Sequence, residues 1–153
     1  MKIIQGDLIQ LALNGEFDVI IHGCNCFCTM GAGIAKSIKS EFPEAYQADL
    51  ETIKGNSGKL GTFSYAKVIR DSHEITVINA YSQFHWKGFG NKVVYSAIRN
   101  VFKDIKKNYS GKKIGYPLIG CGLAGGDWDL IGKIIESELS GEEHTLVKFS
   151  NII

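Results

Sequence analysis

The chain has 153 residues, of which 44% are hydrophobic and 22% are charged, and its formal net charge is +1 at pH 7. This length and apolar content predict a single domain, residues 1–153, with a hydrophobic core of its own. The small net charge does not favour non-specific binding to nucleic acid, and the apolar runs are too short to span a bilayer. Residues 1–7 lack the pattern of a signal peptide, so we expect a cytoplasmic protein, and a monomer.

The first half of the chain is predicted to alternate between strands and helices. A strand is expected over residues 2–5, a short helix over 8–13 and a buried β-branched strand over 18–24. A helix should follow from residue 33 to about residue 41, and a second from residue 44 to about residue 54. Pro43 separates these two helices, because proline ends one helix and starts another.

The second half continues the alternation. Strands are expected over residues 61–69 and 74–80, followed by a polar, aromatic loop over 81–91 and an amphipathic helix over 92–108. A strand over 112–119, a helix from about 127 to 139 and a last strand over 144–149 complete the chain. This order predicts an α/β protein with a mostly parallel sheet, in which ligands bind beyond the carboxyl ends of the strands.

Two glycine-rich loops each join a predicted strand to a helix. The first contains Gly31 and Gly33, and the second covers residues 116–128. Glycines allow a close approach of the backbone, and the free N–H groups at a helix start favour an anion. Gly-x-Gly before a helix also occurs as ordinary turn chemistry, but two such loops favour two phosphates, or one diphosphate held from two sides.

Four polar residues are candidates for chemistry at the strand ends. Asp7 either caps a helix or accepts a hydrogen bond from an adenine amino group. His22 either satisfies a neighbouring backbone group or acts as a general acid or base, and Asn25 suits ribose hydroxyls. Asp127 either caps the helix that follows or orients an attacking water.

The cysteines do not have the spacing of a metal site. Cys24, Cys26 and Cys28 alternate with other residues, and only Cys121 lies elsewhere. Zinc sites prefer longer spacers and a matching second pair, so we expect reduced thiols, no metal and no cofactor. His85, Trp86 and Lys87 form a further aromatic patch, which the sequence assigns equally to a lid or to a surface loop.

These stretches together resemble the macro domain family. The matching pieces occur in family order: Gly6-Asp7-Leu8, Ile21-His22-Gly23-Cys24-Asn25, Met30-Gly31-Ala32-Gly33-Ile34-Ala35, Pro117-Leu118-Ile119-Gly120-Cys121-Gly122-Leu123 and Asp127-Trp128. The resemblance implies a three-layer α/β/α sandwich with a six-stranded mixed, mostly parallel sheet that binds ADP-ribose. Nucleic acid would be a partner only as an ADP-ribosylated substrate.

The resemblance also implies a role for each matching residue. Asp7, with Leu8 beside it, would contact the adenine amine, Phe149 would lie beside the adenine ring, and Asn25 would touch the distal ribose. One side of the diphosphate would be wrapped by Met30, Gly31, Ala32, Gly33, Ile34 and Ala35. The phosphate and distal ribose would be held on the other side by Ile119, Gly120, Cys121, Gly122, Leu123, Ala124 and Gly125.

Two compact branches of the family are similar to this chain, the yeast-type ADP-ribose-1''-phosphate phosphatase and the terminal ADP-ribose glycohydrolase. The glycohydrolase pattern has a lysine after the fourth strand, where this chain reads Asn79-Ala80-Tyr81-Ser82-Gln83, and an aspartate where this chain has Ala124. Both departures count against a lysine adduct. The first hypothesis is therefore the phosphatase, with His22 or Asp127 activating water and Asn25 orienting the ribose.

Three alternatives stay open. One is a hydrolase that removes ADP-ribose from protein or nucleic acid, and another is a reader that binds ADP-ribose without turnover. A Rossmann-type NAD enzyme fits less well, because the glycine loop follows the second strand, the third glycine is missing, and no acidic residue ends a strand about 20 residues later.

Overall fold

The computed structural model describes residues 1–87 and 92–150. The strands are β1 (Lys2–Gly6), β2 (Val19–Cys24), β3 (Phe63–Arg70), β4 (His73–Tyr81), β5 (Ile114–Tyr116) and β6 (His144–Phe149). The helices are α1 (Leu8–Leu13), α2 (Gly33–Glu41), α3 (Pro43–Leu50), α4 (Tyr95–Tyr109) and α5 (Trp128–Glu138), with a short 3₁₀ helix, η1 (Ser57–Lys59).

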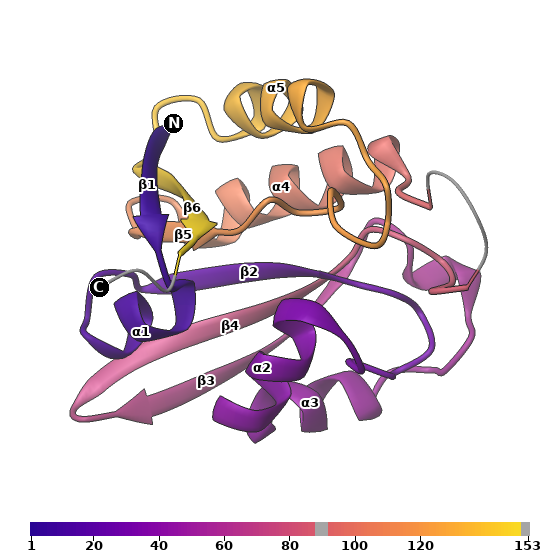
Figure 1. Ribbon diagram of the computed structural model, residues 1–153, viewed down its shortest axis with the longest axis horizontal. Coiled ribbons are helices and arrows are strands. Elements are labelled where there is room, and N and C mark those ends of the chain that lie inside the picture. The colour runs from indigo at the N-terminus through magenta and orange to yellow at the C-terminus, as the bar shows by residue number, and fades with distance from the viewer. Residues whose placement is uncertain (88–91, 151–153) are drawn as a thin grey trace.

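The strands form one mixed sheet in the order β1-β6-β5-β2-β4-β3. Neighbouring strands are parallel except for β3, which runs antiparallel to β4. Helices α4 and α5 lie on one side of the sheet, and α1, α2 and α3 lie on the other (Figure 1). This arrangement confirms the predicted three-layer α/β/α sandwich with a mostly parallel sheet.

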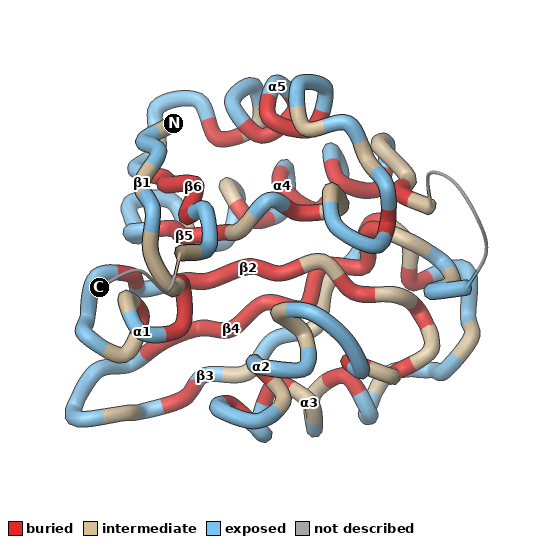
Figure 2. The backbone as a smooth tube through the Cα atoms, in the orientation of Figure 1, coloured by how far each residue is buried: buried red, intermediate tan, exposed pale blue. Residues whose placement is uncertain are grey.

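The alternation of side chains along β2 divides the interior into two cores. Val19 and Ile21 belong to the core under α4 and α5, whereas Ile20 belongs to the core under α1, α2 and α3. Successive side chains of a strand point to opposite faces, so a strand covered on both faces must be apolar throughout. Figure 2 shows β2 and most of β4 buried between the two layers. Within the two described ranges, no helix has the length and apolarity needed to cross a bilayer.

Several predicted boundaries were wrong. The helix expected to reach about residue 54 ends at Leu50, and the helix expected from residue 92 begins at Tyr95, because Val93 pairs with Gln83 in an isolated antiparallel bridge. The strand expected over 112–119 is only Ile114–Tyr116, since Pro117 has no N–H for a ladder bond. The predicted loop 81–91 begins after Tyr81, which ends β4, and residues 88–91 lie outside the described residues.

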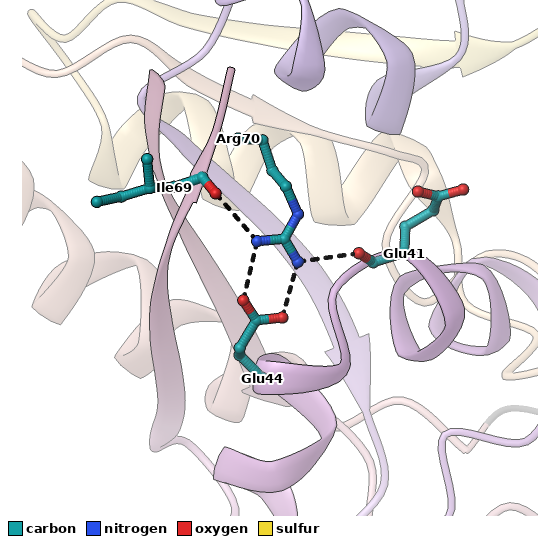
Figure 3. A network of polar contacts seen from close by, with 4 residues as sticks. All are labelled: Glu41, Glu44, Ile69 and Arg70. Carbon is teal, nitrogen blue, oxygen red and sulfur yellow. Dashed lines mark hydrogen bonds and ion pairs between the residues drawn. The ribbon is translucent and has the colours of Figure 1, made fainter. Parts of the chain in front are cut away.

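Arg70 connects the end of β3 to the junction of α2 and α3 (Figure 3). Its guanidinium donates to both carboxylate oxygens of Glu44, at 2.9 and 2.8 Å, and to the backbone carbonyl of Glu41 at 3.3 Å. The Arg70 hydrogen bond lowers the pKa of the Glu44 carboxyl below its usual range. These Arg70 hydrogen bonds hold the carboxyl end of α2 against the sheet. They thereby help to set the direction of α2, including its amino end.

Candidate functional site

A cleft of about 630 Å³ opens beyond the carboxyl ends of β2, β5 and β6, a size typical of small-molecule sites. Most residues singled out from the sequence line it together: Asn25, Met30, Gly31, Ala32, Gly33, Ile34, Ala35, Ile119, Gly120, Cys121, Gly122, Leu123, Ala124 and Phe149. The lining also includes residues that were not assigned to the site from the sequence, among them Thr29, Asp49, Gln83, Trp86 and Val147.

One side of the cleft is the start of α2. Its N-cap residue, Ala32, provides no side-chain hydrogen bond, whereas Asp7 caps α1 and Asp127 caps α5. The first N–H groups of α2 therefore have no partner within the described part of the chain, and they carry the positive end of the helix dipole. An anion in the cleft would satisfy them.

The other side is the loop between β5 and α5. Gly120 and Gly125 adopt left-handed backbone angles, with φ of 75° and 73°, and Gly126 donates to the Gly120 carbonyl at 2.6 Å. Lys92 anchors the loop from outside, since its Nζ donates to the Leu123 carbonyl at 2.8 Å and its backbone N–H to the Ala124 carbonyl at 2.7 Å. These bonds fix the loop without using side chains on the cleft side.

Two cleft glycines that have no positive φ angle leave space for a ligand. A Cβ added to Gly31 would meet only the Thr29 carbonyl, at 3.9 Å, and one added to Gly122 would meet nothing within 4 Å. Gly120 differs, because its Cβ would lie 2.5 Å from a methyl carbon of Val93. The fold therefore requires glycine at position 120, while it leaves positions 31 and 122 open to a ligand.

His22 does not line the cleft. It is fully buried on β2, and its Nε2 is 2.6 Å from the Oδ1 of Asn79 on β4. Burial lowers the pKa of His22 to about 4, despite the opposing effect of the Asn79 hydrogen bond, so the ring is neutral at pH 7. His22 is therefore separated from the cleft, and its ring is paired with the Asn79 side chain rather than with the neighbouring backbone group considered from the sequence. The catalytic role expected for His22 stays a prediction.

Asn25 lines the cleft, but its side chain is also used within its own loop. Its Oδ1 accepts from the Phe27 N–H at 2.8 Å, and its Nδ2 donates to Thr29 Oγ1 at 2.7 Å. The loop is strained further along, where Cys28 and Met30 have positive φ angles of 56° and 41°. Asn25 therefore shapes the loop that it belongs to, and one Nδ2 hydrogen is not used by these two bonds.

The other expected site residues that do not line the cleft are Asp7, Leu8, Gly125 and Asp127. Leu8 is buried in the core beneath α1. Asp7 caps α1 through Oδ1, which leaves Oδ2 for a ligand. The Asp127 carboxylate accepts from the Asp129 N–H at 3.0 Å, so its capping role is confirmed and its expected contact with the cleft is not found.

Asp49 is the carboxylate that the sequence did not reveal. It lies on α3, is 1% exposed, and accepts a 2.6 Å hydrogen bond from the Tyr81 hydroxyl through Oδ1. Its Oδ2 is buried and has no hydrogen-bond partner among the described residues. Desolvation raises the pKa of Asp49, although the Tyr81 hydrogen bond lowers it. No local signal in the sequence marks this residue, because its environment is made by β4 and η1.

The thiols near the cleft are structural. All four cysteines, each within the described residues, are free, and Cys28 Sγ donates to the Asp49 carbonyl at 3.1 Å. Burial raises the pKa of Cys24 and Cys26 above the usual range. Within residues 1–87 and 92–150, no group of three or more histidine, cysteine or acidic side chains is placed to hold a metal ion.

Comparison with known proteins agrees with this geometry. The family model of the Macro domain matches residues 21–135, which include both loops of the cleft. The chain belongs to the macro domain family. This macro domain is 35% identical to an uncharacterized 17.5 kDa protein of Enterobacteria phage T4, over 100% of this chain and 99% of that protein.

Two other relatives have described activities. A DNA ADP-ribosyl transferase–DNA ADP-ribosyl glycohydrolase fusion protein of Thermosipho africanus is 22% identical, over 88% of the macro domain chain and 38% of the fusion protein. An ADP-ribose 1''-phosphate phosphatase of Aspergillus oryzae is 48% identical over 46 residues, which cover 30% of this chain and 21% of that enzyme.

Solved structures share the fold of this macro domain. A Bacteroides thetaiotaomicron protein of unknown function superposes with a TM-score of 0.77 at 23% identity, covering 96% of each chain. The macrodomain of Mycobacterium tuberculosis DarG gives 0.70 at 19% identity, over 97% of this chain and 98% of that one. The Thermosipho africanus DarTG complex with ADP-ribose gives 0.72 at 21% identity, over 99% of this chain and 42% of that one.

Proposed function

We propose that this macro domain binds ADP-ribose in the cleft and hydrolyses the group attached to the distal ribose. The observation that carries the proposal is the uncapped start of α2, which lies across the cleft from the glycine loop between β5 and α5. Backbone N–H groups on both sides suit a diphosphate, whose charge needs several donors in a confined space. The related Thermosipho protein was solved with ADP-ribose, which supports this choice of ligand.

The orientation of the ligand follows from the ends of the cleft. Phe149 and Val147, at the carboxyl end of β6, provide an apolar surface for the adenine, with Asp7 directly after the neighbouring strand β1. Asn25 and Gln83, which follow β2 and β4, then lie at the distal ribose. Gly31 to Ala35 and Gly120 to Ala124 hold the phosphates between these ends.

The first reaction to test is the release of phosphate from ADP-ribose-1''-phosphate. In this reaction water attacks phosphorus, the bond between phosphorus and the ribose oxygen breaks, and that oxygen takes a proton. The Aspergillus phosphatase supports the reaction by its similarity over a short segment. We assign the positioning of water to Asp49, through the Oδ2 that has no hydrogen-bond partner among the described residues, because Asp49 is the only carboxylate among the described lining residues. His22 and Asp127 do not line the cleft.

Calorimetric titration with ADP-ribose, combined with a phosphate-release assay on ADP-ribose-1''-phosphate, tests the proposal. Binding with release supports the phosphatase, and Asp49→Asn should then lower kcat while the affinity for ADP-ribose stays within about two-fold, because the amide keeps the bond to Tyr81. Binding without release of phosphate, and without release of ADP-ribose from any conjugate, would make the protein a reader. No binding would overturn the proposal.

A further inference from the structure

Lys59 is a buried lysine that forms no ion pair with any described residue. It is the last residue of η1 and is only 7% exposed. Its Nζ donates to the Cys26 carbonyl at 3.1 Å and to Cys28 Sγ at 3.6 Å, and it lies 4.5 Å from the centre of the Tyr81 ring. Lysines are almost never buried without an acidic partner. Here the amino group is instead held against a thiol.

Cys28 is held in the same place from its other side. Its Sγ donates to the Asp49 carbonyl at 3.1 Å and lies 3.5 Å from Thr52 Oγ1. In the reduced protein these contacts are structural, because they join the loop after β2 to α3 and to η1. They also keep the sulfur of Cys28 and the nitrogen of Lys59 in contact, which favours any reaction between the two atoms.

The other three thiols have different surroundings. Cys24 lies against the His22 ring, and Cys26 and Cys121 donate to backbone carbonyls. In the part of the chain that the structure describes, no lysine Nζ lies within hydrogen-bond distance of these three sulfur atoms. We therefore expect the oxidation of Cys28 to take a course that the other thiols do not share.

We propose that Lys59 and Cys28 form a modification site, at which hydrogen peroxide joins the two side chains by a reversible covalent cross-link. Peroxide converts a thiol into a sulfenic acid, which condenses with a thiol or a nitrogen beside it. The nitrogen beside Cys28 Sγ is the amine of Lys59. Peroxide is small enough to reach a side chain that is 8% exposed.

The reaction consumes one peroxide and releases two waters. The pair holds three protons, divided either as ammonium and thiolate or as amine and thiol. First, Cys28 Sγ attacks a peroxide oxygen, the O–O bond breaks, and the departing hydroxide takes one proton from the pair. The Lys59 lone pair then attacks the sulfenic sulfur, so that an S–N bond forms and the S–O bond breaks. The second hydroxide leaves with a proton from the nitrogen; peroxide is reduced, and the thiol is oxidised to a sulfenamide.

The cross-link would alter the surroundings of the cleft. Desolvation raises the pKa of Asp49, and the Lys59 charge is one of the two influences that oppose this rise. A sulfenamide carries no charge, so the cross-link should raise that pKa further. It would also tie η1 to the loop that carries Thr29 and Met30 into the cleft. Any effect on hydrolysis rests on the proposed function, whereas the cross-link itself does not.

Mass spectrometry of the folded protein, treated with hydrogen peroxide and then digested with trypsin, tests the proposal. Trypsin should no longer cut after Lys59, and residues 3–36 should be found joined to residues 55–67. The joined pair should be about 2 Da lighter than the sum of the two peptides, because two hydrogens are lost. An added thiol should break the S–N bond and restore both separate peptides.

Lys59→Arg keeps the positive charge without the reactive amine, and it should lower the cross-linked fraction about 10-fold or more. Cys28→Ser should abolish the cross-link, and Cys121→Ser is the matched control that should leave its yield unchanged. Wild-type protein treated in concentrated urea should not form it, which keeps the test decisive even where a variant fails to fold. Oxidation of Cys28 without a joined peptide, a disulfide within residues 3–36 in its place, or an equal yield in urea or in Lys59→Arg would overturn the proposal.

Discussion

At the scale of single residues, Gly31 and Gly122 should be required for ligand binding and not for folding. Both have room for a methyl group in the protein itself, and neither has a positive φ angle. Gly31→Ala and Gly122→Ala should therefore leave the free energy of unfolding within about 0.5 kcal/mol of wild type. In the cleft the same methyl group would compete with the diphosphate, and the affinity for ADP-ribose should fall about 10-fold or more.

Gly120→Ala provides the contrast for this prediction. Its Cβ would lie 2.5 Å from Val93, and its φ of 75° disfavours a side chain. We expect the unfolding free energy to fall by about 2–4 kcal/mol, from strain and overpacking together. Chemical denaturation of the three variants, followed by calorimetry on those that fold, checks both statements. Equal loss of stability in all three would show that the glycines serve only the fold.

His22 makes stability depend on pH. Its pKa is about 4 in the folded protein and about 6.5 in an unfolded chain, so the unfolded state binds more protons between these values. Stability is therefore fully present above pH 6.5 and is lost as the pH falls towards 4, by about 3 kcal/mol in total. Burial also lowers the pKa of His144, which adds to the loss.

Urea denaturation between pH 7.5 and pH 4.5 measures this effect. His22→Gln removes the titrating group, so its unfolding free energy should change less over the same range, whatever its value at pH 7.5. An unchanged slope in the variant would assign the pH dependence to other groups.

At the scale of secondary-structure elements, the start of α2 lacks a cap that would stabilise the protein, and we propose that its free N–H groups bind the ligand instead. Ala32 has the extended backbone of an N-cap residue but no side-chain acceptor. Ala32→Asp should therefore stabilise the protein by about 1 kcal/mol, because the carboxylate accepts from the first N–H groups of α2. It should also weaken ADP-ribose binding, since it places a negative charge where we propose the diphosphate.

Ala32→Asn is the matched control, because the amide caps the helix without the charge. Thermal unfolding and calorimetry should show both variants stabilised, with the aspartate weaker in binding than the asparagine. Stabilised variants with unchanged affinity would remove α2 from the proposed anion site.

The structural features that the sequence predicted correctly depend on residues that lie close together in the chain. The alternation of strands and helices followed from hydrophobic periodicity and from glycine and proline positions, and it is confirmed along the chain. The late start of α4 was not predicted, because the sequence gives no sign that the segments of Gln83 and Val93 pair in a bridge. The same limit applies to the site: the glycine loops are local signals, whereas the hydrogen-bond partner of the buried His22 is Asn79, 57 residues away. Asp49 was missed because its partner, Tyr81, lies on another element.

At the scale of the whole molecule, a ligand in the cleft should stabilise the fold. The cleft joins residues from α2, the β5–α5 loop and the end of β6, so it exists only in the folded chain. ADP-ribose at 100 times its dissociation constant should add about 2.7 kcal/mol and raise Tm by about 5–10 °C. ADP, which lacks the distal ribose, should give a smaller rise at the same concentration. Equal rises for the two ligands would show that the distal end of the cleft contributes no affinity.

The strand order brings the first and last strands of the chain together. The first strand, β1, pairs with the last strand, β6, in register from Lys2–Thr145 to Gly6–Phe149. The sequence predicted both strands but not their pairing, since the closing contact spans almost the whole chain. The same pairing brings Asp7 next to the end of β6 that carries Phe149.

The start of α2 and the loop anchored by Lys92 both line the cleft, and we propose that their backbone N–H groups bind the diphosphate. A recognition surface made of backbone N–H groups is retained through extensive divergence, since every residue type except proline supplies the same donor. In a saturation mutagenesis screen for ADP-ribose binding, damaging replacements should therefore concentrate at the glycines of residues 31–33 and 120–126, while polar substitutions at Cys121 and Leu123 are tolerated. Relatives of this chain can be expected to retain their ligand long after their side chains have ceased to look alike.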